Sequence, residues 1–521
     1  MAYPVASEDH LRALERGSRD ADLDRRRSRM ITATKGPRTL GHRPSIDVLS
    51  QQDVDRIHEA TLQVLEDTGV NVRSGRVLKL LAEAGASVDF DQDIVRFTPV
   101  MVEQALAAAP RTYLMAARDP AFDMMLDRSR GYACVEGGLA EIVDLDTGRP
   151  RKATYQDLVD ATRVADAIDE VTYLWPCTAI SDVPPQDQAV HQTYVQLANS
   201  VKHVVAMTTY NARDARAVLE MGGVVAGGSE ALSARPVVSS FACSISPLTW
   251  DGQPIEAALV FAEAGVPCGI TAMPVSTAGA PTTLAGHLVV ANADVLSGIT
   301  ILQTLFPGAP TYYNPFNAEM NLLTGNLKAA WGPEPVLFNF AAAQMGRRYG
   351  LPVSLGINGT GSKTQDWQAG VQGALLLMGI LGCGDIDLLA CTGGIDSSRV
   401  FSFEQVLLDC ELFEIASLML EGFPTDDEHL AVSVIGEVGP GGHYLGARHT
   451  RKHMRETWQA KFFSSATWDE WEHDGRREPK DRARERAREL IKTHQPTPLP
   501  EDVDRELRSI VDAFTREEVG P

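Results

Sequence analysis

The sequence predicts a (β/α)₈ barrel, or TIM barrel, with an N-terminal α/β region and a C-terminal helical extension. From Tyr132 onward, short apolar runs of strand length alternate with longer segments of helical apolar spacing. Eight such units follow one another, and this number favours a closed barrel over an open sheet. The chain has 521 residues, of which 44% are hydrophobic, so it can build a large core around such a barrel.

Each unit consists of an expected strand and an expected helix. The strands are Tyr132–Val135, Val171–Trp175, His203–Met207, Pro236–Phe241, Pro267–Ala272, Thr311–Asn314, Pro352–Leu355 and Ile386–Cys391. The helices are Tyr155–Ala167, Asp187–Ala198, Ala212–Val225, Pro254–Ala264, Gly286–Leu305, Pro333–Arg348, Thr364–Leu381 and Phe403–Glu421.

These units divide the chain into four expected regions. Residues 1–45 are polar and rich in Arg, and we expect a mobile tail there. Residues 46–130 form an N-terminal α/β region, with one strand expected over Val88–Phe97. Residues 131–425 form the barrel, with a hairpin inserted at 139–153 that turns at Asp146, Thr147 and Gly148. Residues 426–521 form the helical extension.

Composition excludes several classes of function. The net charge of −21 repels phosphate backbones, so we expect no nucleic-acid partner. The seven Cys are odd in number, form no CxxC pair and lie mostly in apolar runs, which is typical of reduced thiols in a cytoplasmic protein. We expect no membrane span, because no apolar run reaches roughly 18 residues without polar interruption.

Function in such a barrel lies where the strands end. The expected strand ends carry no HExxH, P-loop, GxSxG or zinc-ligand spacing, so we expect no metal. They carry instead aromatic rings and neutral amides, which suit a quaternary ammonium ligand bound by ring faces. Ordinary barrel packing is the alternative for these rings. The expected substrate-binding residues at the strand ends are Glu136, Trp175, Tyr210, Trp250, Asn314 and Phe316.

The segment LPVSLGINGTGSKTQDWQAG, residues 351–370, has the layout of a strand, a Gly-rich turn, a polar cluster and a helix. Lys363 is either a partner of the reacting groups or an exposed residue at the helix start, and Asp366 is equally explained as a complement to the helix dipole. The expected binding residues of this loop are Asn358, Gly359, Thr360, Lys363, Asp366 and Gln368.

Four motifs together resemble the trimethylamine methyltransferase family. They are EGGLAEIVDLDTGRPRKATYQDL, TYLWPCTAISDVPP, GINGTGSKTQDWQAG and GGHYLGARHTRKHMRETW. The resemblance covers about residues 50 to 490. It implies a (β/α)₈ barrel and transfer of a methyl group from an amine to the cobalt of a separate corrinoid protein.

The resemblance also bears on the substrate. Founding members of the family carry pyrrolysine in the loop that matches residues 356–370, whereas this loop holds only ordinary residues. A tertiary amine is a poor methyl donor without such help, whereas a quaternary ammonium leaves as a neutral amine. The chain is therefore similar to the branch that includes glycine betaine methyltransferases.

The same resemblance implies the partners. We expect no tightly bound cofactor in this chain, a corrinoid (cobalamin) supplied by a cognate protein, and a homo-oligomer. His443 and His449 are assigned to contact with that cofactor; packing of their helix over the barrel mouth is the alternative. Two other functions stay open: a different methyl acceptor such as a thiol or folate, and non-catalytic binding of quaternary amines.

Overall fold

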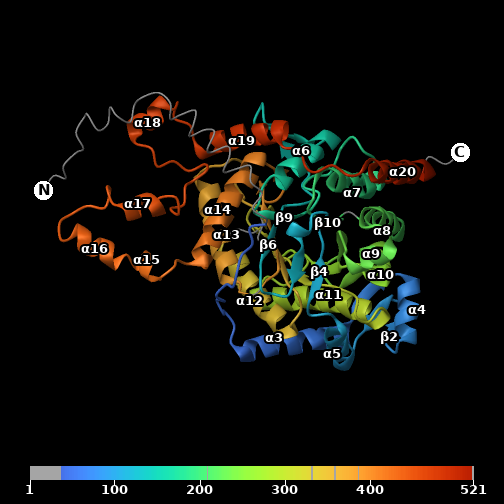
Figure 1. The fold of residues 1–521 in the computed structure, drawn as a ribbon. Coiled ribbons are helices and arrows are strands. Elements are labelled where there is room, and N and C mark those ends of the chain that lie inside the picture. The colour runs from blue at the N-terminus through green and yellow to red at the C-terminus, as the bar shows by residue number, and fades with distance from the viewer. Residues whose placement is uncertain (1–36, 208, 330–331, 357–358, 385, 519–521) are drawn as a thin grey trace.

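In a computed structural model of the chain, residues 37–518 are described, apart from 208, 330–331, 357–358 and 385. Within these residues, eight parallel strands form a barrel in the order β14-β13-β11-β10-β9-β6-β18-β17 (Figure 1). The ring closes where the amide of Tyr313 donates to the carbonyl of Pro352 over 2.9 Å. The barrel strands are β6 Tyr132–Val135, β9 Val171–Leu174, β10 His203–Val205, β11 Val238–Cys243, β13 Cys268–Ala272, β14 Tyr313–Pro315, β17 Ser354–Gly356 and β18 Leu388–Thr392. The predicted barrel is confirmed.

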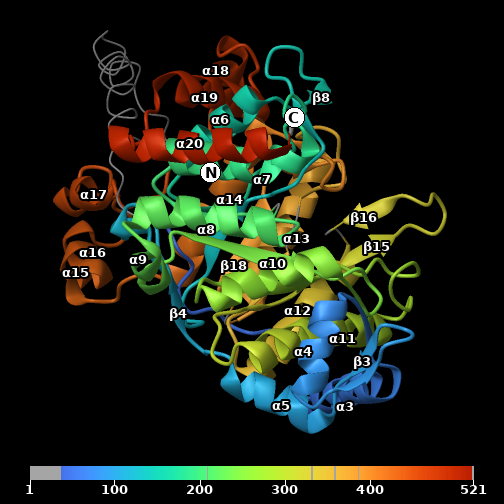
Figure 2. The same ribbon diagram turned by 90° about the vertical axis from the view of Figure 1, so that its right-hand side faces the viewer.

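Helices surround the barrel, as Figures 1 and 2 show from two sides. Local signals define their ends: the Thr154 hydroxyl and the Asp157 carboxylate form a capping box at the start of α6, and Gly350 ends α12 with a φ of 67°. Apart from α9, which was not predicted, they follow the predicted helices closely. The bounds are α6 Tyr155–Asp166, α7 Gln188–Asn199, α8 Ala212–Ala226, α9 Ser229–Ala234, α10 Gly252–Glu263, α11 Leu284–Leu305, α12 Pro333–Tyr349, α13 Trp367–Gly382 and α14 Phe403–Glu421.

Helix α11 differs from the expectation that the chain has no segment apolar enough to span a membrane. Its length and apolar composition are sufficient to cross a bilayer, although we expected no such segment. Its most apolar 18-residue window is 78% buried inside the protein. The helix packs against α3, α5 and the barrel strands, so its apolar surface belongs to the protein core.

The N-terminal region is joined to the barrel by a shared sheet. Strand β12, which follows β11 along the chain, pairs in parallel with β1, so that Asn71 lies opposite Thr249. The expected single strand over 88–97 is wrong: a turn at residues 90–93 separates β2 from β3, and the two pair as a hairpin. The elements are α3 Gln51–Gln63, a π-helical turn Val64–Thr68, β1 Val70–Arg73, α4 Gly75–Glu83, β2 Ser87–Asp89, β3 Ile94–Arg96, α5 Pro99–Ala108, β4 Tyr113–Met115, a 3₁₀ turn Pro120–Phe122, β5 Met124–Leu126 and β12 Thr249–Asp251.

Residues 37–45, which we expected in the mobile tail, pack against the body. Leu40 is fully buried, and the amides and carbonyls of Leu40 and Gly131 form a bridge. The buried guanidinium of Arg43 donates from Nε to the carbonyl of Gly384 over 2.7 Å. The rest of the expected tail, residues 1–36, lies outside the described part of the chain.

Short hairpins follow several barrel strands at the C-terminal end of the barrel. Residues 139–153 contain a hairpin of two strands, and the first of them pairs in parallel with a strand after β18. A second hairpin after β14 was not predicted. The strands are β7 Glu141–Val143, β8 Pro150–Lys152, β15 Ala318–Met320, β16 Leu327–Ala329, β19 Gly394–Ile395 and β20 Val400–Phe401.

The C-terminal extension has two parts. Helices α19 and α20 lie against the barrel helices, and the guanidinium of Arg484 in α19 pairs with buried Glu404 of α14 over 2.8 Å. Residues 423–461, which we call the arm, leave the body after α14 and stand off from it (Figure 1). The elements are α15 Asp427–Leu430, α16 Val432–Val438, α17 Arg448–His453, α18 Trp468–His473, α19 Pro479–Thr493 and α20 Glu501–Glu518, of which α15, α16 and α17 belong to the arm.

Candidate active site

A cluster of aromatic rings lies where the barrel strands end. Trp175 follows β9, Phe241 lies in β11, and Phe316 follows β14. The centroid of the Trp175 ring lies 5.4 Å from that of Phe241 and 6.3 Å from that of Phe316. Trp175 and Phe316 are buried, whereas Phe241 is partly exposed, so the cluster reaches the surface at this end of the barrel. We call these three rings the ring cluster.

The backbone of β17 makes room for one of these rings. A Cβ atom built on Gly356 would lie 1.7 Å from Cε1 of Phe316, so only a glycine allows the ring to sit against this strand. Phe316 was predicted at a strand end, and the structure brings it together with Trp175. Phe241 was not among the expected site residues, although it is the last residue of a predicted strand. Its inward direction in that strand is the signal that could have found it.

Glu136 places a carboxyl group at the same end of the barrel. It follows β6, its amide donates to the carbonyl of Thr392 over 2.7 Å, and it is 3% exposed. Burial raises its pKa from 4.5 to about 7, with the hydroxyl of Ser398 opposing the shift and the charge of Asp409 adding to it. Within the described residues, Oε2 of Glu136 accepts no hydrogen bond. A Cβ atom on Gly394 would lie 1.6 Å from this oxygen, so glycine is required beside it.

Further polar atoms at these strand ends are buried without partners. Nδ2 of Asn314 donates to Oγ1 of Thr271 over 2.9 Å, but its Oδ1 accepts no hydrogen bond from any described residue. Nε1 of Trp175 is likewise unpartnered within the described chain, whereas the side chain of Asn317 hydrogen-bonds to Glu319. Buried polar groups are normally satisfied, so this concentration indicates a place for a polar ligand or water. Asn317 was not among the expected binding residues.

The loop after β17 mostly uses its polar groups to hold itself together. Thr360 hydrogen-bonds through its hydroxyl to the side chain of Gln372, and its amide donates to the carbonyl of Gly394 over 3.0 Å. Gly359 has a φ of 49° and lies beside Glu136, where a Cβ atom would be 3.1 Å from Oε2. These contacts place Gly359 and Thr360 next to the buried carboxyl group. Asn358, which we also expected to bind, lies outside the described residues.

The other residues expected in this loop point elsewhere. Asp366 caps α13 by accepting from the amide of Ala369 over 3.1 Å, which supports the helix-start alternative. Lys363 is 73% exposed, donates to the carbonyl of Gly361 over 2.6 Å and pairs with Asp396 over 3.1 Å. Gln368 is exposed in the first turn of α13. The structure brings none of these three side chains to the ring cluster.

Another ring expected at the strand ends, that of Trp250, lies away from the ring cluster. Trp250 belongs to β12 and is fully buried; its Nε1 donates to Oγ of Ser297 in α11 over 2.9 Å. Its ring therefore packs between the barrel and α11, outside the barrel interior. Tyr210 follows β10 and is 61% exposed. We expected Trp250 in the site because it follows a predicted barrel strand. It lies in β12, a strand inserted after β11, and β12 directs the ring outward.

His443 and His449 lie on the arm. Figure 2 shows α15, α16 and α17 on the side of the molecule away from the β15–β16 hairpin, which extends from the strand-end face. Helix α17 therefore does not pack over this chain's own barrel mouth, contrary to the expected alternative. Nε2 of His449 hydrogen-bonds to the carbonyl of Glu428 over 3.1 Å, and its ring lies 4.3 Å from that of His453.

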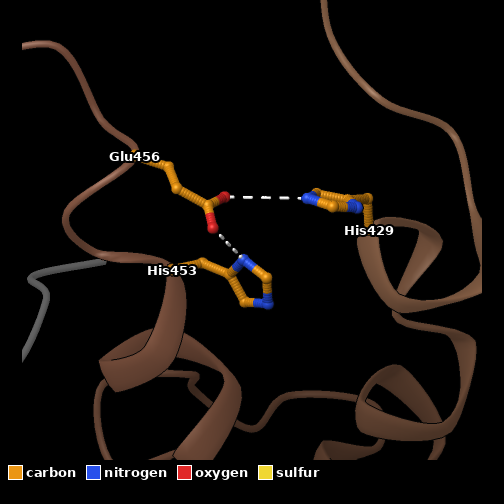
Figure 3. Close-up of side chains that lie close together, drawn as sticks. All are labelled: His429, His453 and Glu456. Carbon is orange, nitrogen blue, oxygen red and sulfur yellow. Dashed lines mark hydrogen bonds and ion pairs between the residues drawn. The ribbon is translucent and has the colours of Figure 1, made fainter. Parts of the chain in front are cut away.

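A second group on the arm could hold a metal ion. His429, His453 and Glu456 each bring one ligand atom within 4.8 Å of the others (Figure 3). The Glu456 carboxylate is 2.8 Å from Nδ1 of His453 and 3.7 Å from Nε2 of His429. The remaining ring nitrogens face Glu428 and Asp426. Because carboxylates already meet all four nitrogens, we describe this group as an ion-pair cluster.

Comparison with known proteins decides the family. Residues 15–519 match the sequence profile of the family described as Trimethylamine methyltransferase (MTTB). The chain belongs to this family. Trimethylamine methyltransferase MttB of Desulfitobacterium hafniense strain DSM 10664 / DCB-2 is 33% identical, over 90% of this chain and 94% of that protein. The glycine betaine methyltransferase of strain Y51 of the same species is 29% identical, over 92% of this chain and 98% of that protein.

The chain is also similar to two methyltransferases of methanogens. MttB of Methanosarcina barkeri is 26% identical over 90% of this chain and 95% of that protein. A crystal structure of the Methanosarcina barkeri monomethylamine methyltransferase (MtmB) covers 91% of this chain and 95% of that chain, with 11% identity and a TM-score of 0.43. The resemblance predicted from the four motifs is confirmed, and the protein is a methyltransferase.

Proposed function

We propose that the protein transfers a methyl group from a quaternary amine of the glycine betaine type to the cobalt of a separate corrinoid protein. The observation that carries this proposal is the presence of the ring cluster and of the buried carboxyl group of Glu136 at the same end of the barrel. The relative named glycine betaine methyltransferase supports the substrate class.

The ring cluster fits the cationic end of such a substrate. A quaternary ammonium has no N–H to donate, so it is bound by ring faces, each contributing about 0.5–2 kcal/mol. The rings of Trp175, Phe241 and Phe316 come from separate strands and are fixed by barrel packing. Ionised Glu136 supplies a countercharge, and a bound cation would favour its ionised form.

An unpartnered donor fits the carboxylate end. Nε1 of Trp175 is a buried donor without an acceptor within the described residues. A betaine brings a carboxylate that can accept from it, and charge-assisted hydrogen bonds of this type are stronger than neutral ones. Trimethylamine has no group that can accept this hydrogen bond. This donor therefore favours a betaine over a simple methylamine.

The chemistry that remains for this chain is positioning. In the transfer, one N–CH₃ bond breaks, its electron pair stays on nitrogen, and a neutral tertiary amine leaves. The reduced corrinoid cobalt of the partner protein would supply the nucleophile. No proton has to move, so the rings and Glu136 need only hold the cation with one methyl group directed out of the barrel. The loop at residues 356–370 contains only standard amino acids, which suits this route.

The state of the cysteines is consistent with a protein of the cytoplasm. The six cysteines whose structure is described are free, and five of them are buried. Burial raises the pKa of the thiols of Cys134 and Cys268, so these thiols resist oxidation. Reduced thiols and a reduced cobalt acceptor both suit the cytoplasm.

A methyl-transfer assay tests the proposal. The purified protein is mixed with its cognate corrinoid protein in the Co(I) state, and glycine betaine or trimethylamine is added. We expect conversion of the cobalt spectrum and release of dimethylglycine with betaine, and little reaction with trimethylamine. A reaction with trimethylamine alone would contradict the substrate class. Demethylation of betaine without the corrinoid protein would point to a different acceptor, and tight betaine binding without turnover to a binding protein.

A further inference from the structure

The arm is a long surface segment with no core of its own. It leaves the body after Glu421 and is fastened again where the Glu411 carboxylate accepts from the amides of Lys461 and Phe462 over 2.6 and 3.1 Å. Residues 423–461 are all described, and none of them is buried. Figure 1 shows the arm extending away from the body beside α13 and α14.

The arm nevertheless carries many large apolar side chains. Leu445 is 88% exposed and Val432 is 71% exposed. Monomeric soluble proteins rarely expose contiguous apolar patches of more than a few hundred Å². Such a surface is typical of a segment that another molecule covers. The exposed large apolar residues of the arm are Phe423, Leu430, Val432, Ile435, Tyr444, Leu445, Met454 and Trp458.

The internal contacts of the arm are too weak to fix its shape. Its helices α15, α16 and α17 have four, seven and six residues, and isolated helices of this length are not stable in water. The ties between them are exposed polar contacts, such as the ion pair of Lys452 with Glu428 and the hydrogen bond of His449 to the carbonyl of Glu428. Exposed pairs of this kind contribute about 0–1 kcal/mol each. The arm therefore needs support from outside the chain.

A matching uncovered surface lies on α13. Its residues Trp367, Val371 and Met378 recur at helical spacing and are 86%, 41% and 53% exposed. No charged residue occurs between Trp367 and Gly382. A helix that is apolar all round is expected in a buried position, yet the outward face of α13 is open in the single chain. We call these three residues the α13 stripe.

We propose that the arm of one copy covers the α13 stripe of a second copy, and that the second copy returns the same contact. A two-fold interface requires both surfaces on every chain, and this chain has both. A standard interface uses roughly 20–30 residues a side, which the arm and α13 can supply together.

A second copy fits better than a transient partner. Permanent interfaces are more hydrophobic than transient ones, which are about as apolar as the rest of a protein surface. A partner that exchanges during turnover would leave the arm and the α13 stripe open to water at every cycle. The density of apolar side chains on the arm therefore favours a permanent contact.

The mass of the intact protein in solution tests the proposal. We expect light scattering to give at least a dimer for the unaltered chain at micromolar concentration. Two double variants, Val371→Glu with Met378→Glu on the stripe and Val432→Glu with Leu445→Glu on the arm, should each raise the dissociation constant by more than about tenfold. The control Val100→Glu, on exposed α5, should leave the mass unchanged. Circular dichroism checks that the variants are folded.

Mixing the two double variants tests whether the arm pairs with the stripe. In the mixed dimer one of the two contacts is unaltered on both sides, whereas each single variant has both contacts damaged. We therefore expect partial recovery of the dimer on mixing. A monomeric unaltered chain, a mass insensitive to both variants, or no recovery on mixing would overturn the proposal. Protection of the arm from hydrogen exchange only after a corrinoid protein is added would assign the surface to that protein instead.

Discussion

At the scale of single residues, Glu136 lies in an environment that is unfavourable for an ionised carboxylate, and it lies at the end of the barrel where functional groups are expected. Its carboxyl group is buried, and its pKa is raised to about 7. Folding therefore favours the protonated form, and ionisation near neutral pH destabilises the folded state. Retention of such a group at the end of the barrel that carries the ring cluster is typical of a binding or catalytic site.

Replacement of Glu136 by Gln should have opposite effects on the stability of the protein and on its affinity for the substrate. Between pH 4.5 and about 7 the folded protein holds more protons on Glu136 than the unfolded chain, so its contribution to stability falls as pH rises. Gln does not titrate. At pH 8, Glu136→Gln should therefore raise the free energy of unfolding by about 1–3 kcal/mol relative to the unaltered protein, with a much smaller gain at pH 5. Urea unfolding at both pH values measures this.

The same variant should bind the substrate cation more weakly. Calorimetry with glycine betaine at pH 8 should show a loss of affinity, because the countercharge is gone. A neutral isostere of betaine should lose less. Equal losses for the cation and the isostere, or a stability gain that does not depend on pH, would show that Glu136 has a structural role only.

The rings give a second prediction. Phe316→Leu should weaken betaine binding by about 1–2 kcal/mol, because an aliphatic side chain lacks the ring face that attracts a cation. Trp250→Phe is the matched control: it should lower thermal stability by removing the hydrogen bond to Ser297, and leave the affinity unchanged. Loss of affinity in the Trp250 variant alone would contradict the assignment of the ring cluster.

At the scale of elements, strand β17 contributes to the site because Gly356 has no side chain where the Phe316 ring packs. Gly356→Ala would place a methyl group 1.7 Å from the Phe316 ring, so the ring must move. Overpacking of this kind typically costs about 1–3 kcal/mol. We expect a lower melting temperature together with a loss of betaine affinity. A Cβ atom from Gly370→Ala in α13 meets no atom of its own chain within 4 Å, and this variant should raise the stability of the single chain by about 0.5–1 kcal/mol without changing affinity. Identical effects of both variants would contradict the close approach.

The barrel was readable from the sequence because its signals are local. Every barrel strand is a short apolar run before a helical segment, so alternation alone located all eight. The site was less readable, because strand ends identify a face but not the direction of a side chain. Trp175 and Phe316 were predicted and meet in the structure, whereas Trp250 is carried outward by β12. Lys363 and Asp366 looked functional in the sequence, but in the structure Lys363 pairs with Asp396 and Asp366 caps α13.

At the scale of the whole molecule, the N-terminal segment secures the far end of the barrel. The guanidinium of Arg43 is buried against the backbone carbonyls of Gly384 and Ile386, which precede β18. Arg43→Met should lower the free energy of unfolding by about 1.5–3 kcal/mol, because hydrogen bonds from a charged group are lost. Betaine affinity should not change. Arg56→Met, at an exposed position in α3, is the control, and an equally large effect there would contradict this role.

The parallel pairing of β1 with β12 has a consequence for synthesis of the chain. Asn71 leaves the ribosome long before its partner Thr249 exists, so β1 has only the β2–β3 hairpin beside it while most of the barrel is being made. Pairings that join distant parts of a sequence form slowly, and an unpaired strand edge is open to aggregation in the meantime. Nascent chains of this enzyme should therefore depend on chaperones until residue 251 has emerged.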